Sequence, residues 1–125
     1  MKPSSEQLAN ICGIAHDSSL RGAGRSLHEL IDTSGYRHLR PSLSEGLIAD
    51  YLAEHPELVA QWSMYSDDKR TSGGWYFLHE ADSWVVGRLG PAGNRSDELH
   101  FDSASEACAR FILLELDFWM NLQRS

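Results

Sequence analysis

The chain has 125 residues, of which 42% are aliphatic or aromatic and 23% are charged, as in ordinary globular proteins. These proportions exclude a disordered, fibrous or low-complexity chain, and no apolar run is long enough to cross a membrane. Eighteen acidic and 11 basic residues give a formal net charge of −7. Because the first residues lack the apolar stretch of a secretory signal, we expect a cytoplasmic protein, with residues 1–125 forming a single domain.

The acidity is concentrated in the last two thirds of the chain. Residues 41–125 hold 14 acidic and 6 basic side chains, a net charge of −8. A field of this sign repels phosphate backbones and therefore disfavours nucleic-acid binding. It would steer the protein toward a cationic protein partner, although a net negative charge that only keeps a small protein soluble is the alternative.

Helical spacing of apolar residues dominates the first half of the chain. The spacing predicts a helix over residues 5–16 and a second helix capped by Ser26 and ended by Gly35. A third helix is expected to be capped by Ser42, and a fourth to begin at Pro56.

Two polar segments are expected to be loops. Residues 21–25 are glycine-rich with an arginine at each end, which favours a connecting loop, with anion binding as the alternative. Residues 67–74 combine charges with two glycines and are expected to form a loop after the fourth helix.

Short aromatic and β-branched runs replace the helical pattern after this loop. Residues 75–80 and 84–89, joined by a polar turn, predict a β-hairpin, and residues 98–101 predict a third short strand. The period of two places alternate residues of the first strand on opposite faces: Trp75, Phe77 and His79 on one, and Tyr76, Leu78 and Glu80 on the other.

A last helix, capped by Asp102 or Ser103 and running to about Leu122, carries apolar residues on more than one face. It is therefore expected to be largely buried, with Cys108 as a small core residue. The predicted fold class is α+β: a helical N-terminal half, then a three-stranded antiparallel meander packed on the long C-terminal helix.

The sequence carries no recognised catalytic or metal-binding motif. Its six histidines and two cysteines include no H-x-x-x-H, H-E-x-x-H or C-x-x-C pattern, so we expect no metal and no cofactor. His79 and His100 lie on predicted strands and could be neighbours, with Asp82 or Glu98 nearby. An imidazole oriented by a carboxylate is a general acid or base, so a small cytoplasmic enzyme is the alternative function.

Three segments together carry a resemblance. They read W-x-x-Y-S-x-D-K-R-T-S-x-G-W-Y-F at 62–77, W-V-V-G at 84–87 and F-D-S-x-x-E-A-C-x-x-F-I at 101–112. The chain, over about residues 35–118, resembles small immunity proteins encoded beside polymorphic bacterial toxins of the contact-dependent growth inhibition and Rhs type. The resemblance implies a cytoplasmic protein that binds a cognate toxin domain, often a nuclease, and blocks it. It assigns no toxin-contacting residues.

The acidic turns of the C-terminal half supply the expected partner contacts. The candidate residues for binding the toxin domain are Asp67, Asp68, Glu80, Asp82, Asp97 and Glu98. A nucleic-acid-binding module is a third hypothesis, since four arginines could form a local basic patch in the acidic chain: Arg21, Arg25, Arg37 and Arg40. The sequence leaves the oligomeric state open.

Overall fold

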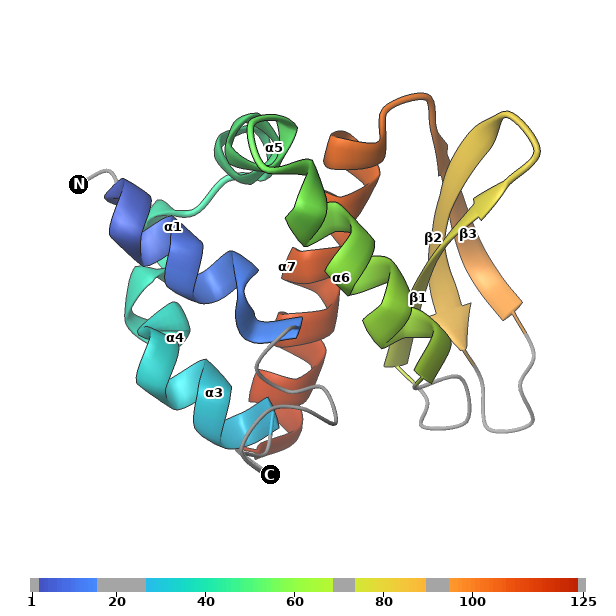
Figure 1. Cartoon of the computed structure of the whole chain (residues 1–125). Helices are drawn as coiled ribbons and strands as arrows, with labels where there is room; N and C mark the ends of the chain where they lie inside the picture. Colours follow the sequence, from blue (N-terminus) through green and yellow to red (C-terminus); the bar gives the residue numbers. More distant parts are fainter. Residues whose placement is uncertain (1–2, 16–26, 69–73, 90–94, 124–125) are drawn as a thin grey trace.

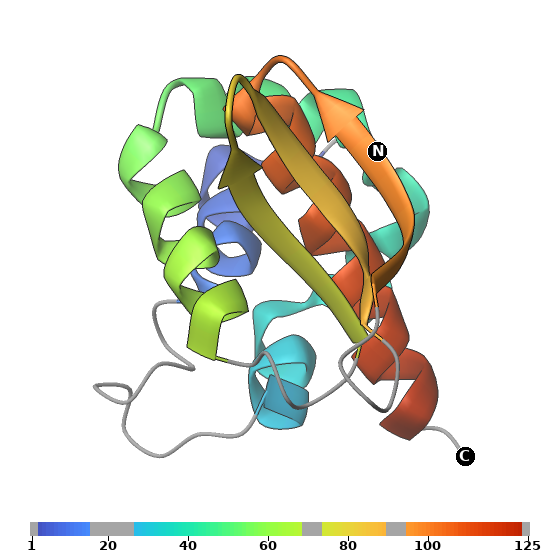
Figure 2. The same ribbon diagram turned by 90° about the vertical axis from the view of Figure 1, so that its right-hand side faces the viewer.

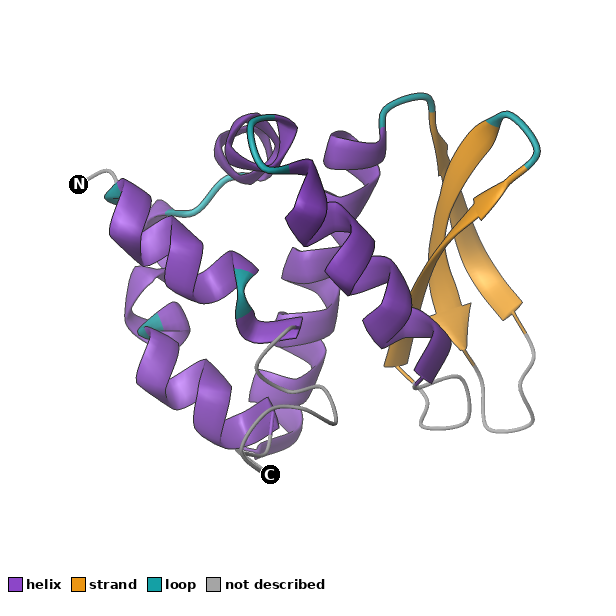
Figure 3. Ribbon diagram, viewed as in Figure 1, coloured by secondary structure: helices purple, strands orange, loops and turns teal. Residues whose placement is uncertain are grey.

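A computed structural model describes residues 3–15, 27–68, 74–89 and 95–123. These residues form an α+β structure with helices in the N-terminal half and a three-stranded antiparallel sheet that packs on a long C-terminal helix, which confirms the predicted fold class (Figure 1, Figure 3). The helices are α1 (Ser5–Cys12), α3 (Leu27–Ser34), α4 (Tyr36–Leu39), the 3₁₀ helix η1 (Arg40–Ser42), α5 (Glu45–Ala53), α6 (Pro56–Asp68) and α7 (Ala104–Gln123). The strands are β1 (Gly74–Glu80), β2 (Ser83–Leu89) and β3 (Arg95–Phe101).

Local sequence signals set most of the helix ends. The Ser4 side chain accepts a hydrogen bond from the Gln7 backbone N–H, and the Gln7 side chain accepts one from the Ser4 N–H, so a capping box begins α1. Gly35, with φ +83°, follows α3 directly, as the sequence predicted. Pro56 is the first residue of α6, where its missing N–H has no helical partner to lose.

Three boundary predictions were wrong. Ser44, not Ser42, caps α5, because the Ser44 hydroxyl accepts the Leu47 N–H at 3.1 Å while Ser42 belongs to η1. Helix α1 ends at Cys12, earlier than the predicted end at residue 16. Helix α6 continues through Asp68, so the first two residues of the predicted 67–74 loop are helical. Residues 69–73, the glycine-rich segment 21–25 and the predicted cap Ser26 lie outside the described residues.

The sheet has the order β1-β2-β3 with antiparallel neighbours. Ala81 and Asp82 form the two-residue hairpin turn, in which Ala81 has φ +49°. Pairing of Trp75 with Arg88, and of Phe77 with Val86, confirms the predicted alternation of faces along β1. Strand β3 begins earlier than residue 98, at Arg95, and a bulge interrupts its pairing with β2 between Val86 and Arg88.

Helix α7 is the central element of the fold. It contacts all three strands on one side and α3, α5 and α6 on others (Figure 1), and Figure 2 shows the sheet in front of it. Phe77 of β1 stacks on both Phe111 of α7 and Trp84 of β2, with ring centroids 5.7 and 5.3 Å apart. Trp62 of α6 packs edge-on against Phe111, and its indole N–H donates to the Cys12 carbonyl oxygen at 2.9 Å. The helical half and the sheet therefore share one aromatic core.

None of the helices within the described residues is long and apolar enough to span a bilayer.

Candidate functional site

The outer face of the sheet is the face turned away from α7. The strand register places Tyr76, Val85 and Glu98 on this face. Tyr76 is only 3% exposed there and Val85 is fully buried, which is unusual for a sheet face over which the described residues place no helix or second sheet. Tyr76 lies opposite Gly87, and a Cβ built on Gly87 would come 2.5 Å from the Tyr76 hydroxyl oxygen. The glycine therefore lets the tyrosine ring lie flat across β2.

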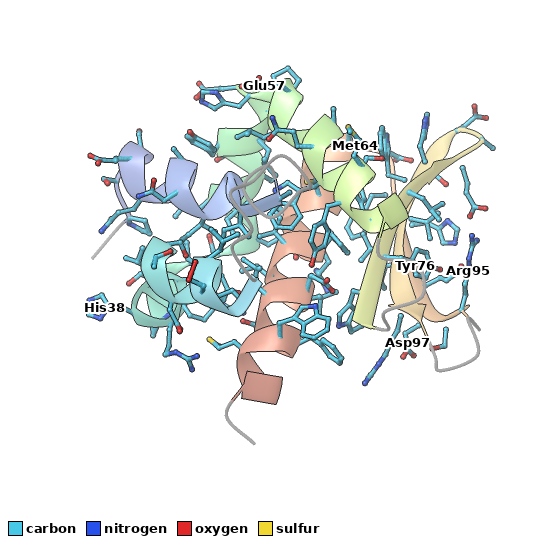
Figure 4. All side chains as sticks on the ribbon, turned by 60° about the horizontal axis from the view of Figure 1, so that its bottom comes forward. His38, Glu57, Met64, Tyr76, Arg95 and Asp97 are labelled. Atoms are coloured by element: carbon cyan, nitrogen blue, oxygen red, sulfur yellow. The ribbon has the colours of Figure 1, made fainter. Side chains whose placement is uncertain are left out.

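Charged side chains surround this ring. The Tyr76 hydroxyl donates a hydrogen bond to the Glu98 carboxylate, and the Arg95 guanidinium carbon lies 5.2 Å from the Tyr76 ring centroid. Arg95 Nη1 also lies 3.6 Å from a Glu80 carboxylate oxygen. Burial raises the pKa of Tyr76, and the hydrogen bond to Glu98 raises it further, so the hydroxyl stays protonated and remains a donor. We call Tyr76, Glu80, Arg95 and Glu98 the outer-face cluster; Figure 4 shows Tyr76 and Arg95 on the strand side of the molecule.

The structure brings two of the predicted contact residues into this cluster. Glu80 and Glu98 belong to it, and both are exposed. Asp82 is exposed in the hairpin turn, and Asp97 is exposed beside the bulge with φ +54°. Asp82 lies in a turn as expected, and Glu80 and Glu98 lie on the strands predicted for residues 75–80 and 98–101. The expected turn position is wrong for Asp97, which lies on β3.

The remaining predicted pair lies elsewhere. Asp67 and Asp68 are the last residues of α6, on helical backbone, and their side chains lie outside the described part of the chain. Residues 74–89 and 95–103, which form the sheet and the turn after it, carry five acidic and two basic side chains, a net charge of −3. The sheet and its following turn are therefore an acidic surface.

The two strand histidines do not meet. His79 pairs with Trp84 across the hairpin and its ring stacks on that indole, with centroids 4.3 Å apart, on the face toward α7. His100 pairs with Val85 and projects from the outer face, where its Nδ1 lies 3.5 Å from the Ser83 hydroxyl. Because β2 separates them and they lie on opposite faces, the prediction that they could be neighbours is wrong. Among the described residues no group of three or more His, Cys, Asp or Glu side chains gathers as metal ligands would.

The proposed basic patch is also not assembled in the part of the chain that the structure describes. Arg37 lies 3.5 Å from Asp32, and Arg40 Nε lies 3.0 Å from Asp117. Arg21 and Arg25 lie outside the described residues. The two visible arginines are therefore committed to carboxylates of the same chain.

Glu115 is a buried carboxylate that the sequence analysis missed. It is fully buried in α7 and accepts hydrogen bonds from the Tyr65 hydroxyl at 2.7 Å, the Trp75 backbone N–H at 3.1 Å and the Trp119 indole N–H at 2.9 Å. Burial raises the pKa of Tyr65, as does the nearby Glu115 charge. The donors come from α6, β1 and α7, so Glu115 fastens the sheet to the helices. Its position among the apolar residues Ile112, Leu116 and Trp119 was the available signal.

Asp117 makes a second link of this kind, at the edge of the helical half. It accepts the Tyr36 hydroxyl at 2.7 Å and Arg40 Nε at 3.0 Å. Burial raises the pKa of Tyr36, and the hydrogen bond to Asp117 adds to the rise. Asp117 therefore joins α4 and η1 to α7, a structural use of its charge.

The two thiols are core groups. Cys12 and Cys108 are both fully buried and free, which confirms the prediction for Cys108. Burial raises the pKa of Cys12 to about 12 and that of Cys108 well above the usual range. Since the thiolate is the nucleophile, neither thiol suits covalent catalysis.

Comparisons of the chain with protein-family models, curated proteins and solved structures find no match. The resemblance to immunity proteins therefore rests on the three motifs between residues 62 and 112 alone.

Proposed function

We propose that the protein is an immunity protein, a stoichiometric inhibitor that binds a cognate bacterial toxin domain, a nuclease, in the cytoplasm. The observation that carries this proposal is the acidic surface of the sheet, where Glu80, Asp82, Asp97 and Glu98 are all exposed. The motif resemblance supports the same class of protein.

An acidic surface on a sheet suits this task for two physical reasons. Nucleases bind phosphate groups, so their active-site surfaces are rich in positive charge, and a surface of opposite sign accelerates encounter. Arg95, placed between Glu80 and the Tyr76 ring, restricts the side chains around it. Ordered side chains lose less conformational entropy when a partner binds.

The alternative, a small enzyme, gains no support from the described residues. Its two histidines occupy opposite faces of the sheet, and the buried Glu115 and the partly buried Asp117 accept structural hydrogen bonds. An inhibitor that binds the surface of another protein does not need its histidines and carboxylates to lie close together.

Co-expression with the C-terminal domain encoded by the gene directly upstream tests the proposal. We expect the two chains to co-purify as a 1:1 complex at low salt, and the chain to protect cells from that domain. The double variant Asp82→Lys/Asp97→Asn should weaken the complex about tenfold or more, as expected when close charge pairs are lost. The matched control, Glu6→Lys/Asp50→Asn, changes the charge equally at exposed helical positions and should bind as the parent does.

Absence of a complex at low salt would refute the proposed function. Equal weakening by the two double variants would show that only total charge matters, which would refute the sheet surface as the contact.

A further inference from the structure

A groove of about 650 Å³ lies on a different surface from the outer-face cluster. It runs between the end of α5, the first turns of α6, the start of β2 and the start of α7, and its lining includes Leu52, Pro56, Ala60, Ser63, Trp84 and Ala104. Trp84 belongs to the face of the sheet that meets α7, so the groove and the cluster lie on opposite sides of the sheet.

Small side chains on two helices produce this hollow. Ala60 of α6 and Ala104 of α7 face it with no more than a methyl group, and Ser63 adds only a hydroxymethyl group. Trp84 is held between Phe77 and His79 by ring stacking, with centroids 5.3 and 4.3 Å away. A fixed aromatic wall next to small residues forms a preformed site for an apolar side chain.

Acidic residues neighbour the groove-lining residues in the sequence. Glu54, Glu57, Asp102 and Glu106 are exposed, and each adjoins in sequence a residue that lines the groove. No lysine or arginine occupies such an adjoining position. A Glu57 carboxylate oxygen lies 3.6 Å from His55 Nδ1.

An exposed apolar side chain extends the surface. Met64 lies one turn beyond Ala60 on α6 and is 65% exposed, the most exposed large apolar side chain among the described residues. Figure 4 shows Glu57 and Met64 along the same helix, with Met64 nearer the strands. Flexible methionines at a surface adapt to the shape of an apolar partner.

We propose that this groove binds an apolar side chain of a protein partner that is flanked by lysine or arginine. Charge complementarity selects this occupant, because four exposed acidic residues directly precede or follow the mostly apolar residues that line the groove. The inference rests on the proposed function, in that the partner is the toxin domain, and it assigns that domain a second contact surface besides the outer face of the sheet.

A titration of the full chain with defined peptides tests the chemistry of the groove. Amide chemical shifts of the ¹⁵N-labelled protein are followed on addition of Ac-Lys-Leu-Leu-Lys-Leu-Lys-amide, and separately of Ac-Glu-Leu-Leu-Glu-Leu-Glu-amide. We expect the basic peptide alone to shift Ala60, Ser63 and Ala104, with a millimolar or tighter dissociation constant. Shifts elsewhere only, or equal shifts with the acidic peptide, would overturn the inference.

One matched pair of variants extends the test. Ala60→Arg fills the groove and adds a positive charge, whereas Ala9→Arg makes the same change at an exposed position of α1, away from the groove. Both sites are exposed helix positions where arginine is well tolerated, and thermal melting checks that both variants fold. Ala60→Arg should abolish the peptide shifts, and Ala9→Arg should leave them unchanged.

The same pair, measured with the upstream-encoded domain, separates the two proposals. About a tenfold loss of affinity for Ala60→Arg, with none for Ala9→Arg, supports the groove as a toxin contact. Equal binding by both variants overturns the groove inference and leaves the proposed function standing. Absence of any complex with the parent chain overturns the proposed function, and the peptide titration then decides the groove alone. Self-association of the parent that Ala60→Arg abolishes would identify a second copy as the occupant and overturn the inference.

Discussion

Replacement of Glu115 tests whether a buried carboxylate holds the sheet to the helices. In the parent, one carboxylate oxygen accepts from both the Tyr65 hydroxyl and the Trp119 indole, and the other accepts from the Trp75 backbone N–H. Glutamine keeps the shape of the side chain but has one oxygen and one NH₂ group. In the orientation that keeps two of the three hydrogen bonds, the amide oxygen accepts from Tyr65 and Trp119. The amide NH₂ then faces the Trp75 N–H, so two donors oppose each other.

The expected cost follows from these contacts. A buried donor that loses its acceptor costs about 1–3 kcal/mol, and the two remaining bonds lose their charge assistance. Because the amide is neutral, relief of charge burial offsets part of this, and Glu115→Gln should lower the free energy of unfolding by about 2 kcal/mol. Glu115→Leu deprives three donors of this acceptor at once and should cost about 4 kcal/mol or more.

Urea denaturation at constant pH measures these differences. Tyr65→Phe, which removes a single donor, should cost about 1 kcal/mol, and its effect should shrink in the Glu115→Gln background. A Glu115→Leu variant as stable as the parent would refute the structural role of this carboxylate.

Three further predictions concern alkaline pH, the sheet face and the thiols. Burial raises the pKa of Tyr65, so the folded state keeps a phenol proton that the unfolded state loses above about pH 10. The stability that Tyr65 gains from this difference is complete below about pH 10 and disappears as pH rises through the folded-state pKa. Between about pH 10 and 11, Tyr65→Phe should therefore lose less stability than the parent, by up to about 1.4 kcal/mol per pH unit in urea titrations, and parallel pH profiles would contradict this. Gly87→Ala should lower the free energy of unfolding by about 1–3 kcal/mol, because the new Cβ would meet the opposing Tyr76 ring. Gly46→Ala, whose Cβ meets nothing within 4 Å, is the control and should leave the stability unchanged or raise it. Thermal melts compare the two variants, and the reverse order of stability would contradict the packing. Neither of the two cysteines should react with Ellman's reagent in the folded protein and both should react in denaturant, and fast labelling of the native chain would show that they are accessible.

The sequence predicted the parts of the fold that local chemistry decides. The apolar period of the last helix, the proline that begins α6 and the alternation from Trp75 to Glu80 all appear as expected. These features depend on backbone sterics and on burial of one face, both of which operate over a few residues.

Features that depend on distant partners were not predictable in the same way. Two serines, Ser42 and Ser44, precede α5, and Ser44 is the cap because Ser42 is part of η1. Strand β3 begins at Arg95, because pairing with β2 across a bulge extends a segment whose own sequence is too polar to indicate a strand.

The candidate site was partly predictable for a related reason. Acidic character alone identified Glu80, Asp82 and Glu98 as surface groups, which the structure places on the sheet and its turn. It could not separate them from Glu115 and Asp117, because only the fold decides which carboxylates meet internal donors. The groove beside Trp84 arises from small residues on two helices and has no pattern in the linear sequence.

The most direct test of the central claim is the association rate of the chain with the upstream-encoded domain as a function of ionic strength, measured by stopped-flow fluorescence. If negative charge on the sheet drives encounter, the rate constant should fall about tenfold or more between low salt and about 0.3 M salt, and Asp82→Lys/Asp97→Asn should flatten this dependence. A rate constant that is insensitive to salt, or equally salt-dependent in the parent and the variant, would contradict the claim.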